Sequence, residues 1–309
     1  MFNISYREAS AVASRHLILA ALFFLPRAKK IALERRLRGK QEHAYLQEAD
    51  WALVSWGKSG RTWFRVMLSR FYQLHFGLDT DYMLEFDNFH RLNPKAPKVL
   101  FSHNNYIRDY LGAWDNLDYY KGRKLVLLVR DPRDVAVSQY FQWRYRMRPR
   151  KKALNSYPAH GTDVDIFDFV SNRDCGIPRI VEAFNTWARS MPALGDDVLL
   201  VRYEDLRSDP AEVLRRVVAF TGTDGSPEHI EAARDYADYE NMKKREAEKD
   251  GMRGSGQRVK PGDTANPDSF KVRRGKVGGY RDYFTPEQVQ VVDAMVNDAL
   301  DPSFGYTAP

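Results

Sequence analysis

The sequence predicts an α/β fold in which a central parallel sheet is flanked by helices. Apolar runs of strand length recur along the chain, each followed by polar turn residues and then by a helical pattern. These runs span residues 52–55, 99–102, 125–129 and 198–201. The first run leads into a glycine-bearing turn with a lysine, and 43% of the 309 residues are hydrophobic, which is enough for one large core.

The N-terminal segment, residues 1–48, is predicted to be a helical extension of a domain that spans residues 49–309. Residues 16–25 are almost all apolar, and six cations follow them before Gly39. This apolar stretch is too short to cross a bilayer, and no small-residue cleavage site follows it. Two interpretations stay open: a helix docked on the domain, which we favour, and a basic amphipathic anchor on an anionic membrane.

The turn after the first strand is predicted to bind an anion. Gly57 and Gly60 permit a tight turn, and apolar residues then recur at helical spacing. A helix that begins at Arg61 or Thr62 would direct its free N–H groups and positive dipole end at a phosphate or sulfate. Lys58 would add a full charge.

The same residues allow two other interpretations of this turn. Ser59 or Thr62 could simply cap a surface helix. Residues 57–59 also match the end of the nucleotide-triphosphate P-loop, but Ala52 stands where that motif has its first glycine.

Candidate functional residues also follow the second and third strands. His103 is positioned as a general base, or else as a hydrogen-bonded structural histidine. Arg130 should lie at a strand end and Ser138 about two turns into the next helix, so both could reach one phosphate. The alternative is an ordinary ion pair of Arg130 with Asp131 or Asp134.

The fourth strand is followed by Tyr203, which could face the ligand cleft. Residues 272–285 place three cations around Gly275, whose missing side chain permits close approach of an anion. Residues 144–161 and 243–270 are expected to be loops or lids, because they lack a sustained apolar period.

Charge and cysteine content restrict the class of protein. The net charge of +7 and a pI near 9.3 favour polyanionic partners. One cysteine, Cys175, cannot form an intramolecular disulfide or a cysteine-based zinc cluster, which suits a reducing, cytoplasmic compartment.

Taken in order, the motifs after the strands resemble those of the cytosolic-type sulfotransferase family, whose fold is P-loop-like and whose members use 3'-phosphoadenosine 5'-phosphosulfate (PAPS). The resemblance runs from about Ala52 to Thr285. Residues 58–63 are similar to the family's 5'-phosphosulfate loop, and residues 129–138 are similar to its 3'-phosphate motif. Residues 203–206 and 273–285 also match motifs of the family.

The resemblance implies a role for each matched residue. His103 would be the catalytic base, with Lys58 assisting, and Lys58 and Thr62 would hold the phosphosulfate. Trp63 and Tyr239 would flank the adenine. The implied cofactor-binding set is Lys58, Ser59, Gly60, Arg61, Thr62, Trp63, Arg130, Ser138, Tyr203, Tyr239, Arg273, Arg274 and Gly275.

Four positions depart from the family's pattern. Arg61 stands where threonine is usual, Asp131 replaces a common asparagine, and Gly279 and Tyr280 replace an Asp-Trp pair. Arg61 could add a sulfate contact or point at an anionic acceptor.

The predicted function is therefore in-line transfer of the sulfuryl group from PAPS to an acceptor hydroxyl, leaving 3',5'-adenosine bisphosphate (PAP). The acceptor could be a carbohydrate, a lipid or a small alcohol, held by residues 79–92, 144–161 and 243–270. We expect no metal and no nucleic-acid partner, with peripheral membrane contact through the N-terminal segment as the open alternative. The competing hypotheses are a P-loop kinase or NTPase, and a basic nucleic-acid-binding or membrane-binding protein.

Overall fold

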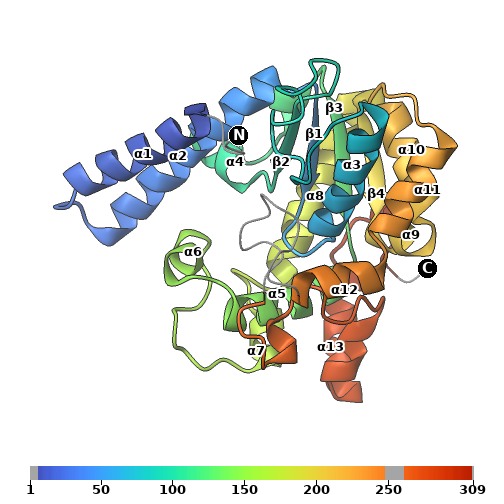
Figure 1. Cartoon of the computed structure of the whole chain (residues 1–309). Helices are drawn as coiled ribbons and strands as arrows, with labels where there is room; N and C mark the ends of the chain where they lie inside the picture. Colours follow the sequence, from blue (N-terminus) through green and yellow to red (C-terminus); the bar gives the residue numbers. More distant parts are fainter. Residues whose placement is uncertain (1–5, 248–260, 308–309) are drawn as a thin grey trace.

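The four predicted strands form one parallel sheet. A computed structural model describes residues 6–247 and 261–307 of the chain. The strands are β1 (Trp51–Ser55), β2 (Val99–Ser102), β3 (Lys124–Val129) and β4 (Val198–Arg202), in the order β2-β1-β3-β4. Each begins and ends within one residue of its predicted bounds. All three strand pairs are parallel, so the carboxyl ends lie along one edge (Figure 1).

Helices cover both faces of the sheet, so the fold has three layers. Alternate residues of β1 point to opposite faces: Ala52 and Val54 join one hydrophobic core, whereas Trp51 and Leu53 join the other. The second core is closed mainly by α3 (Arg61–His75), α10 (Pro210–Phe220) and α11 (Pro227–Tyr236). The first is closed by α4 (Asn105–Leu111), α5 (Pro132–Tyr145), α7 (Ile166–Ser171), α8 (Ile177–Leu194) and α13 (Pro286–Asn297).

Four of these helices begin in the same way. In α5, α10, α11 and α13 the N-cap side chain accepts a hydrogen bond from a backbone N–H of the first turn, and proline occupies the next position. The N-cap residues are Asp131, Asp209, Ser226 and Thr285. Proline costs no hydrogen bond there, because the first N–H groups of a helix have no partner in any case.

Two predicted loops contain helical structure. Residues 144–161 include α6 (Pro149–Leu154), and the described part of residues 243–270 includes the end of α12 (Tyr239–Ala247) and a 3-10 turn at Pro267–Ser269. These elements are too short to produce a sustained apolar period. Residues 248–260 of the predicted lid lie outside the described residues. The short helix α9 (Tyr203–Ser208) follows β4 directly.

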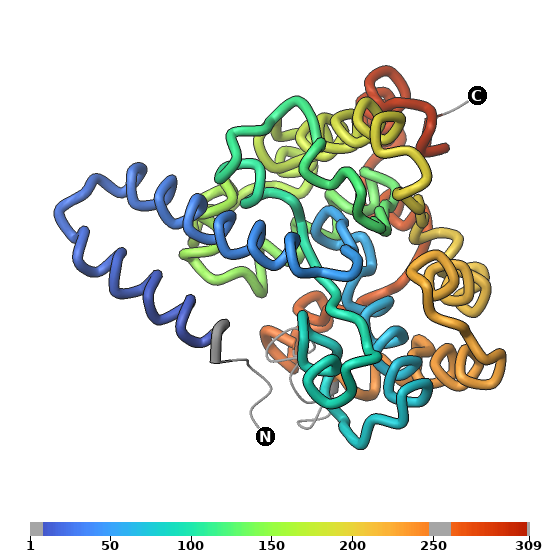
Figure 2. The backbone as a smooth tube through the Cα atoms, turned by 90° about the horizontal axis from the view of Figure 1, so that it is seen from above, coloured from blue at the N-terminus to red at the C-terminus, as the bar shows by residue number. Residues whose placement is uncertain are grey.

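The N-terminal segment forms a helical hairpin of α1 (Tyr6–Ala21) and α2 (Arg27–Glu48). Figure 2 shows this hairpin extending away from the rest of the molecule, with α2 returning to it. Gly39 lets α2 approach α4 closely, since a Cβ there would lie 2.0 Å from the backbone oxygen of Tyr106. Within the described residues, no helix combines the length and apolarity needed to cross a membrane.

Candidate active site

A large cavity lies where the carboxyl ends of β1, β2 and β3 meet. Its volume is about 1340 Å³, and it brings together residues from all the motifs that follow the strands. Of the described residues that line it, seventeen are Lys or Arg and three are Asp or Glu. This charge balance fits a ligand with several negative charges.

The turn after β1 adopts the conformation that an anion-binding loop requires. Lys58 and Gly60 both have positive φ angles, 75° and 93°, and α3 begins at Arg61 without a side-chain cap, which excludes the capping interpretation. A side chain at Gly60 would collide with Tyr203, whose ring lies 2.5 Å from the position of a Cβ. Ser59 is fully buried, and its hydroxyl has no hydrogen-bond partner in the described part of the chain.

Lys58 lies in a strongly cationic environment. Burial, followed by repulsion from Arg146, Arg130 and Arg273, lowers its pKa to about 7, and the nearby Glu246 offsets this only partly. An ammonium group is therefore costly there until an anion arrives. The geometry fits a lysine whose charge is stabilised by its ligand.

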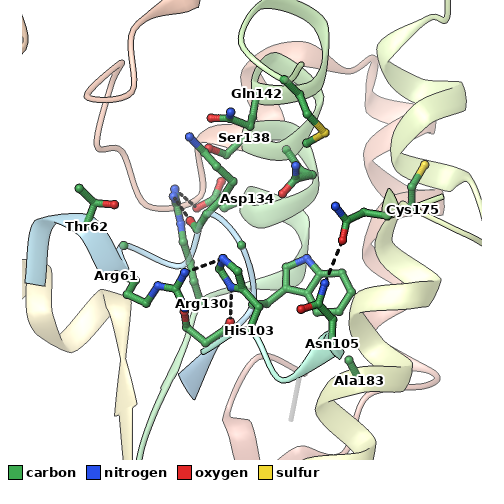
Figure 3. Close-up of a pocket in the computed structure, with 18 of the residues that line it drawn as sticks. Arg61, Thr62, His103, Asn105, Arg130, Asp134, Ser138, Gln142, Cys175 and Ala183 are labelled. Carbon is green, nitrogen blue, oxygen red and sulfur yellow. Dashed lines mark hydrogen bonds and ion pairs between the residues drawn. The ribbon is translucent and has the colours of Figure 1, made fainter. Parts of the chain in front are cut away.

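His103 is held in a defined tautomer at the end of β2 (Figure 3). Its Nδ1 lies 2.7 Å from the backbone oxygen of Ser55, which can only accept, so Nδ1 carries the proton. Its Nε2 lies 2.6 Å from a guanidinium nitrogen of Arg61, which can only donate, so Nε2 has a lone pair. Burial, with Arg61 as the second cause, holds the pKa of His103 well below its ordinary value. The imidazole is therefore neutral at pH 7, as a base must be.

Arg130 contacts both the cavity and the protein. Its guanidinium stacks on the ring of Tyr203 at 4.3 Å and forms an ion pair with Asp134 at 3.4 Å. The ion pair predicted as the alternative role of Arg130 is therefore present, and Arg130 also lines the cavity. Its Nε is buried without a hydrogen-bond partner among the described residues, which leaves a donor for a ligand. Ser138, in α5, lines the same cavity.

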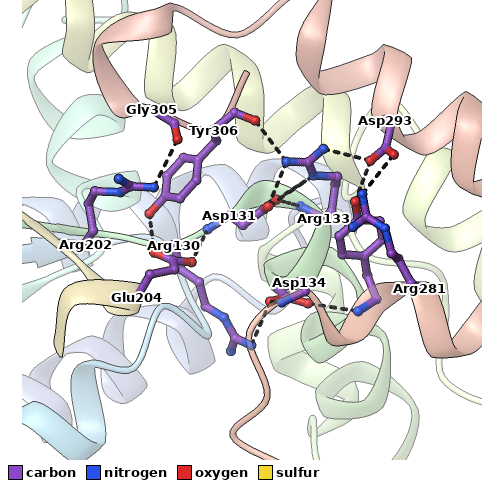
Figure 4. A network of polar contacts seen from close by, with 12 residues as sticks. Arg130, Asp131, Arg133, Asp134, Arg202, Glu204, Arg281, Asp293, Gly305 and Tyr306 are labelled. Atoms are coloured by element: carbon purple, nitrogen blue, oxygen red, sulfur yellow. Dashed lines mark hydrogen bonds and ion pairs between the residues drawn. The ribbon is translucent and has the colours of Figure 1, made fainter. Parts of the chain in front are cut away.

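Asp134 also ties the C-terminal basic motif to α5. Its two carboxylate oxygens accept hydrogen bonds from the backbone N–H groups of Gly278 and Tyr280, each at 2.9 Å (Figure 4). This brings Arg273 and Arg274 to the cavity that Arg130 lines. Asp131, by contrast, forms an ion pair with Arg133 at 2.8 Å, and Arg133 in turn forms an ion pair with Asp293 of α13.

The aromatic residues assigned to the adenine lie on one side of the cavity. The ring nitrogen of Trp63 donates to the backbone oxygen of Ala237 at 2.6 Å, and the Tyr239 hydroxyl donates to the backbone oxygen of Arg273 at 3.2 Å. A Cβ at Gly275, whose φ is 59°, would lie 3.3 Å from the Tyr239 ring.

Several cavity residues were missed by sequence reasoning. Lys271 donates to the Thr62 hydroxyl at 2.5 Å, and the Arg207 guanidinium lies 5.6 Å from the Trp63 ring and 6.0 Å from the Tyr239 ring. Lys271 immediately precedes the basic motif and could have been included with it. Arg207 gives no such signal, because it lies on α9 among ordinary surface charges.

The predicted acceptor pocket was partly wrong. Of its three segments, residues 79–92 do not line the cavity, because Met83, Leu84 and Phe89 pack into the core around α3. Most of residues 146–157 do line it, whereas the described part of residues 243–270 does not, and only the flanking Met242 and Lys271 reach the cavity. The N-terminal hairpin, which the prediction did not include, contributes His16, Arg35 and Arg38 to the lining of the cavity. Within residues 6–247 and 261–307 no group of three His, Cys, Asp or Glu side chains is arranged to hold a metal, and the metal-free scheme stays a prediction.

A three-layer α/β fold with a cationic cavity at the carboxyl edge of its sheet is typical of proteins that bind phosphorylated nucleotides or similar anions. A family model described as the sulfotransferase domain matches residues 119–304, and the chain belongs to that family. The family predicted from the motifs is confirmed.

Relatives of known name support the same assignment. Cytosolic sulfotransferase 17 of Arabidopsis thaliana is 28% identical over 187 residues, which are 57% of this chain and 49% of that protein. Cytosolic sulfotransferase 15 of the same plant is 24% identical over 283 residues, 84% of this chain and 74% of that protein. The chain thus spans only about half the length of the first of these relatives.

Solved structures share the fold. The mouse sulfotransferase SULT7A1, complexed with PAP, has a TM-score of 0.54 and 21% identity over 84% of this chain and 89% of that chain. Retinol dehydratase, in complex with androsterone and PAP, has a TM-score of 0.52 and 18% identity over 80% of this chain and 79% of that chain. The predicted α/β fold with a central parallel sheet is therefore confirmed.

Proposed function

We propose that this protein transfers the sulfuryl group of PAPS to an acceptor hydroxyl with His103 as the base. The observation that carries the proposal is the convergence of a neutral His103, Lys58 and Arg130 on one cavity at three successive strand ends. The PAP bound to the solved relatives supports the choice of donor. Sulfuryl transfer leaves PAP as the product.

The donor would span the cavity. The turn at residues 57–62 would hold the phosphosulfate, with the buried hydroxyl of Ser59 and the N-terminus of α3 as donors. Arg130, Ser138, Arg273, Arg274 and Gly275 would hold the 3'-phosphate, and Trp63, Tyr203 and Tyr239 would surround the nucleotide.

In the transfer step the acceptor oxygen attacks sulfur as its proton passes to Nε2 of His103. The bond between sulfur and the bridging oxygen of the 5'-phosphate breaks, and its electron pair stays on that oxygen. Lys58 and the N–H groups of the turn would stabilise this negative charge. The hydrogen bond from His103 Nδ1 to Ser55 keeps Nε2 free of a proton before the step.

Arg61 imposes a condition on this step. Its guanidinium donates to the same Nε2 that must receive the proton, and to the backbone oxygen of Ser102 at 2.5 Å. Once Nε2 carries a proton, Arg61 can no longer donate to it. Arg61 must therefore move from His103 when the acceptor binds, toward either the sulfuryl oxygens or an anionic group of the acceptor.

The acceptor class is tested with PAPS labelled in its sulfuryl group. The full chain is incubated with three pools from cell extract, namely carbohydrates, lipids and small alcohols, and the labelled product is identified by mass. The proposal is supported if the label enters one of the pools and if the His103→Ala variant labels that pool far more slowly. Hydrolysis of ATP under the same conditions, with no transfer from PAPS, would favour the P-loop kinase or NTPase. We propose a cytoplasmic location, in keeping with the named cytosolic relatives.

A further inference from the structure

The N-terminal hairpin ends in an exposed apolar tip, defined here as residues 17–30. Four large apolar side chains of the tip lie open to solvent: Leu17 is 70% exposed, Ile18 40%, Phe23 78% and Phe24 68%. These are four of the ten exposed large hydrophobic residues in the described part of the chain. Figures 1 and 2 both show the tip as the point of the hairpin farthest from the sheet.

The tip is also cationic. Residues 9–33 contain no Asp or Glu. Arg27 and Lys29 are exposed beside the apolar side chains, and Lys30 donates from its ammonium group to the backbone oxygen of Phe23 at 2.5 Å. Aromatic side chains flanked by cations, without acidic residues, match the charge and polarity of an anionic bilayer surface.

The root of the hairpin, by contrast, is fixed to the domain. Arg35 of α2 forms an ion pair with Asp109 of α4 at 2.5 Å, and Leu46 is fully buried in the core. Gly39 allows the close packing of α2 on α4 described above. The hairpin therefore holds its tip at a defined place, while Phe23 and Phe24 pack mainly on each other, with ring centroids 5.9 Å apart.

We propose that the tip of the hairpin docks on an anionic membrane surface, with Phe23 and Phe24 inserted at the interface and Arg27 and Lys29 beside the headgroups. Burial of the two rings and attraction of the cations would act together. The docking surface belongs to the same hairpin that contributes Arg35 and Arg38 to the cavity. If the proposed sulfuryl transfer holds, docking would keep the cavity close to acceptors in or near the bilayer.

The proposal is tested by sedimentation of the full chain with vesicles. One set contains phosphatidylcholine with about a third phosphatidylglycerol, and the other contains phosphatidylcholine alone. We expect binding to the anionic vesicles that weakens as salt rises, because ions screen the cations. The double variant Phe23→Ser, Phe24→Ser should bind at least tenfold more weakly. The control, Leu92→Ser with Val291→Ser, removes two exposed apolar side chains elsewhere and should bind like the unchanged chain.

Calorimetric titration with PAP and the melting temperature serve as independent measures of the tip variant. Both should be unchanged, because the two phenylalanines are exposed and do not line the cavity. Equal binding to both vesicle types, or undiminished binding of the tip variant, would overturn the proposal. So would the absence of vesicle binding by the unchanged chain, and a change of oligomeric state in the tip variant would then indicate that a second copy covers the tip. If the unchanged chain does not bind PAP at all, the proposed function is contradicted, but the membrane proposal is not.

Discussion

The pKa of Lys58 predicts that PAP binds more weakly as pH rises. In the ligand-free protein this pKa is lowered to about 7 by burial and by Arg146, Arg130 and Arg273, with Glu246 opposing them. The phosphates of PAP favour the ammonium form, so binding raises the pKa again. Ligand then binds the protonated protein, and its affinity falls roughly tenfold for each pH unit between about pH 7 and the bound-state pKa.

The assay is calorimetric titration with PAP between pH 7.5 and 9.5, in buffers of different ionisation enthalpy. This range lies above the second pKa of a phosphate monoester, about 6, and His103 does not titrate in it because its pKa is lowered. At pH 9, binding should take up nearly one proton. Lys58→Arg keeps the charge at every pH and should abolish both the uptake and the slope. An unchanged slope in Lys58→Arg would refute the reasoning.

Three further predictions follow from the site and the fold. His103→Ala should lower turnover by about 10²–10⁴-fold, as for loss of a general base, with PAP affinity nearly unchanged in calorimetry; near-normal turnover would exclude the base assignment. Arg130→Ala should weaken PAP binding by about 2–5 kcal/mol and hardly affect the analogue without the 3'-phosphate; equal losses would indicate a folding defect. Gly39→Ala should cost about 1–3 kcal/mol of unfolding free energy, seen as a lower melting temperature, since its Cβ meets the Tyr106 backbone; an unchanged melting temperature would contradict the close packing of α2 on α4.

The parts of the fold that could be predicted are those that depend on the pattern of neighbouring residues in the sequence. Strands of a parallel sheet that are buried on both faces, as β1 and β3 are, form continuous apolar runs, and the edge strands β2 and β4 are also apolar runs, so all four are predicted within one residue of their ends. Because such strands end at one edge, the residues that follow them were expected to meet, and Lys58, His103 and Arg130 do line one cavity.

The parts that could not be predicted depend on contacts between distant segments. The hydrogen bond from Arg61 to His103 joins residues 42 positions apart. The close packing of α2 on α4 depends on Gly39 against Tyr106, and a glycine within a helix usually signals only lower helix stability. The wall assigned to residues 79–92 was wrong for the same reason, since the sequence of this mixed segment does not reveal that Met83, Leu84 and Phe89 join the core around α3.

The central claim is that this cavity is built for a nucleotide with a 3'-phosphate and a 5'-phosphosulfate. It is tested most directly by calorimetric titration of the full chain with PAPS, PAP and ATP, with and without Mg²⁺. We predict one site that binds PAPS and PAP far more tightly than ATP, with no dependence on Mg²⁺. Tighter binding of ATP, dependent on Mg²⁺, would contradict the account.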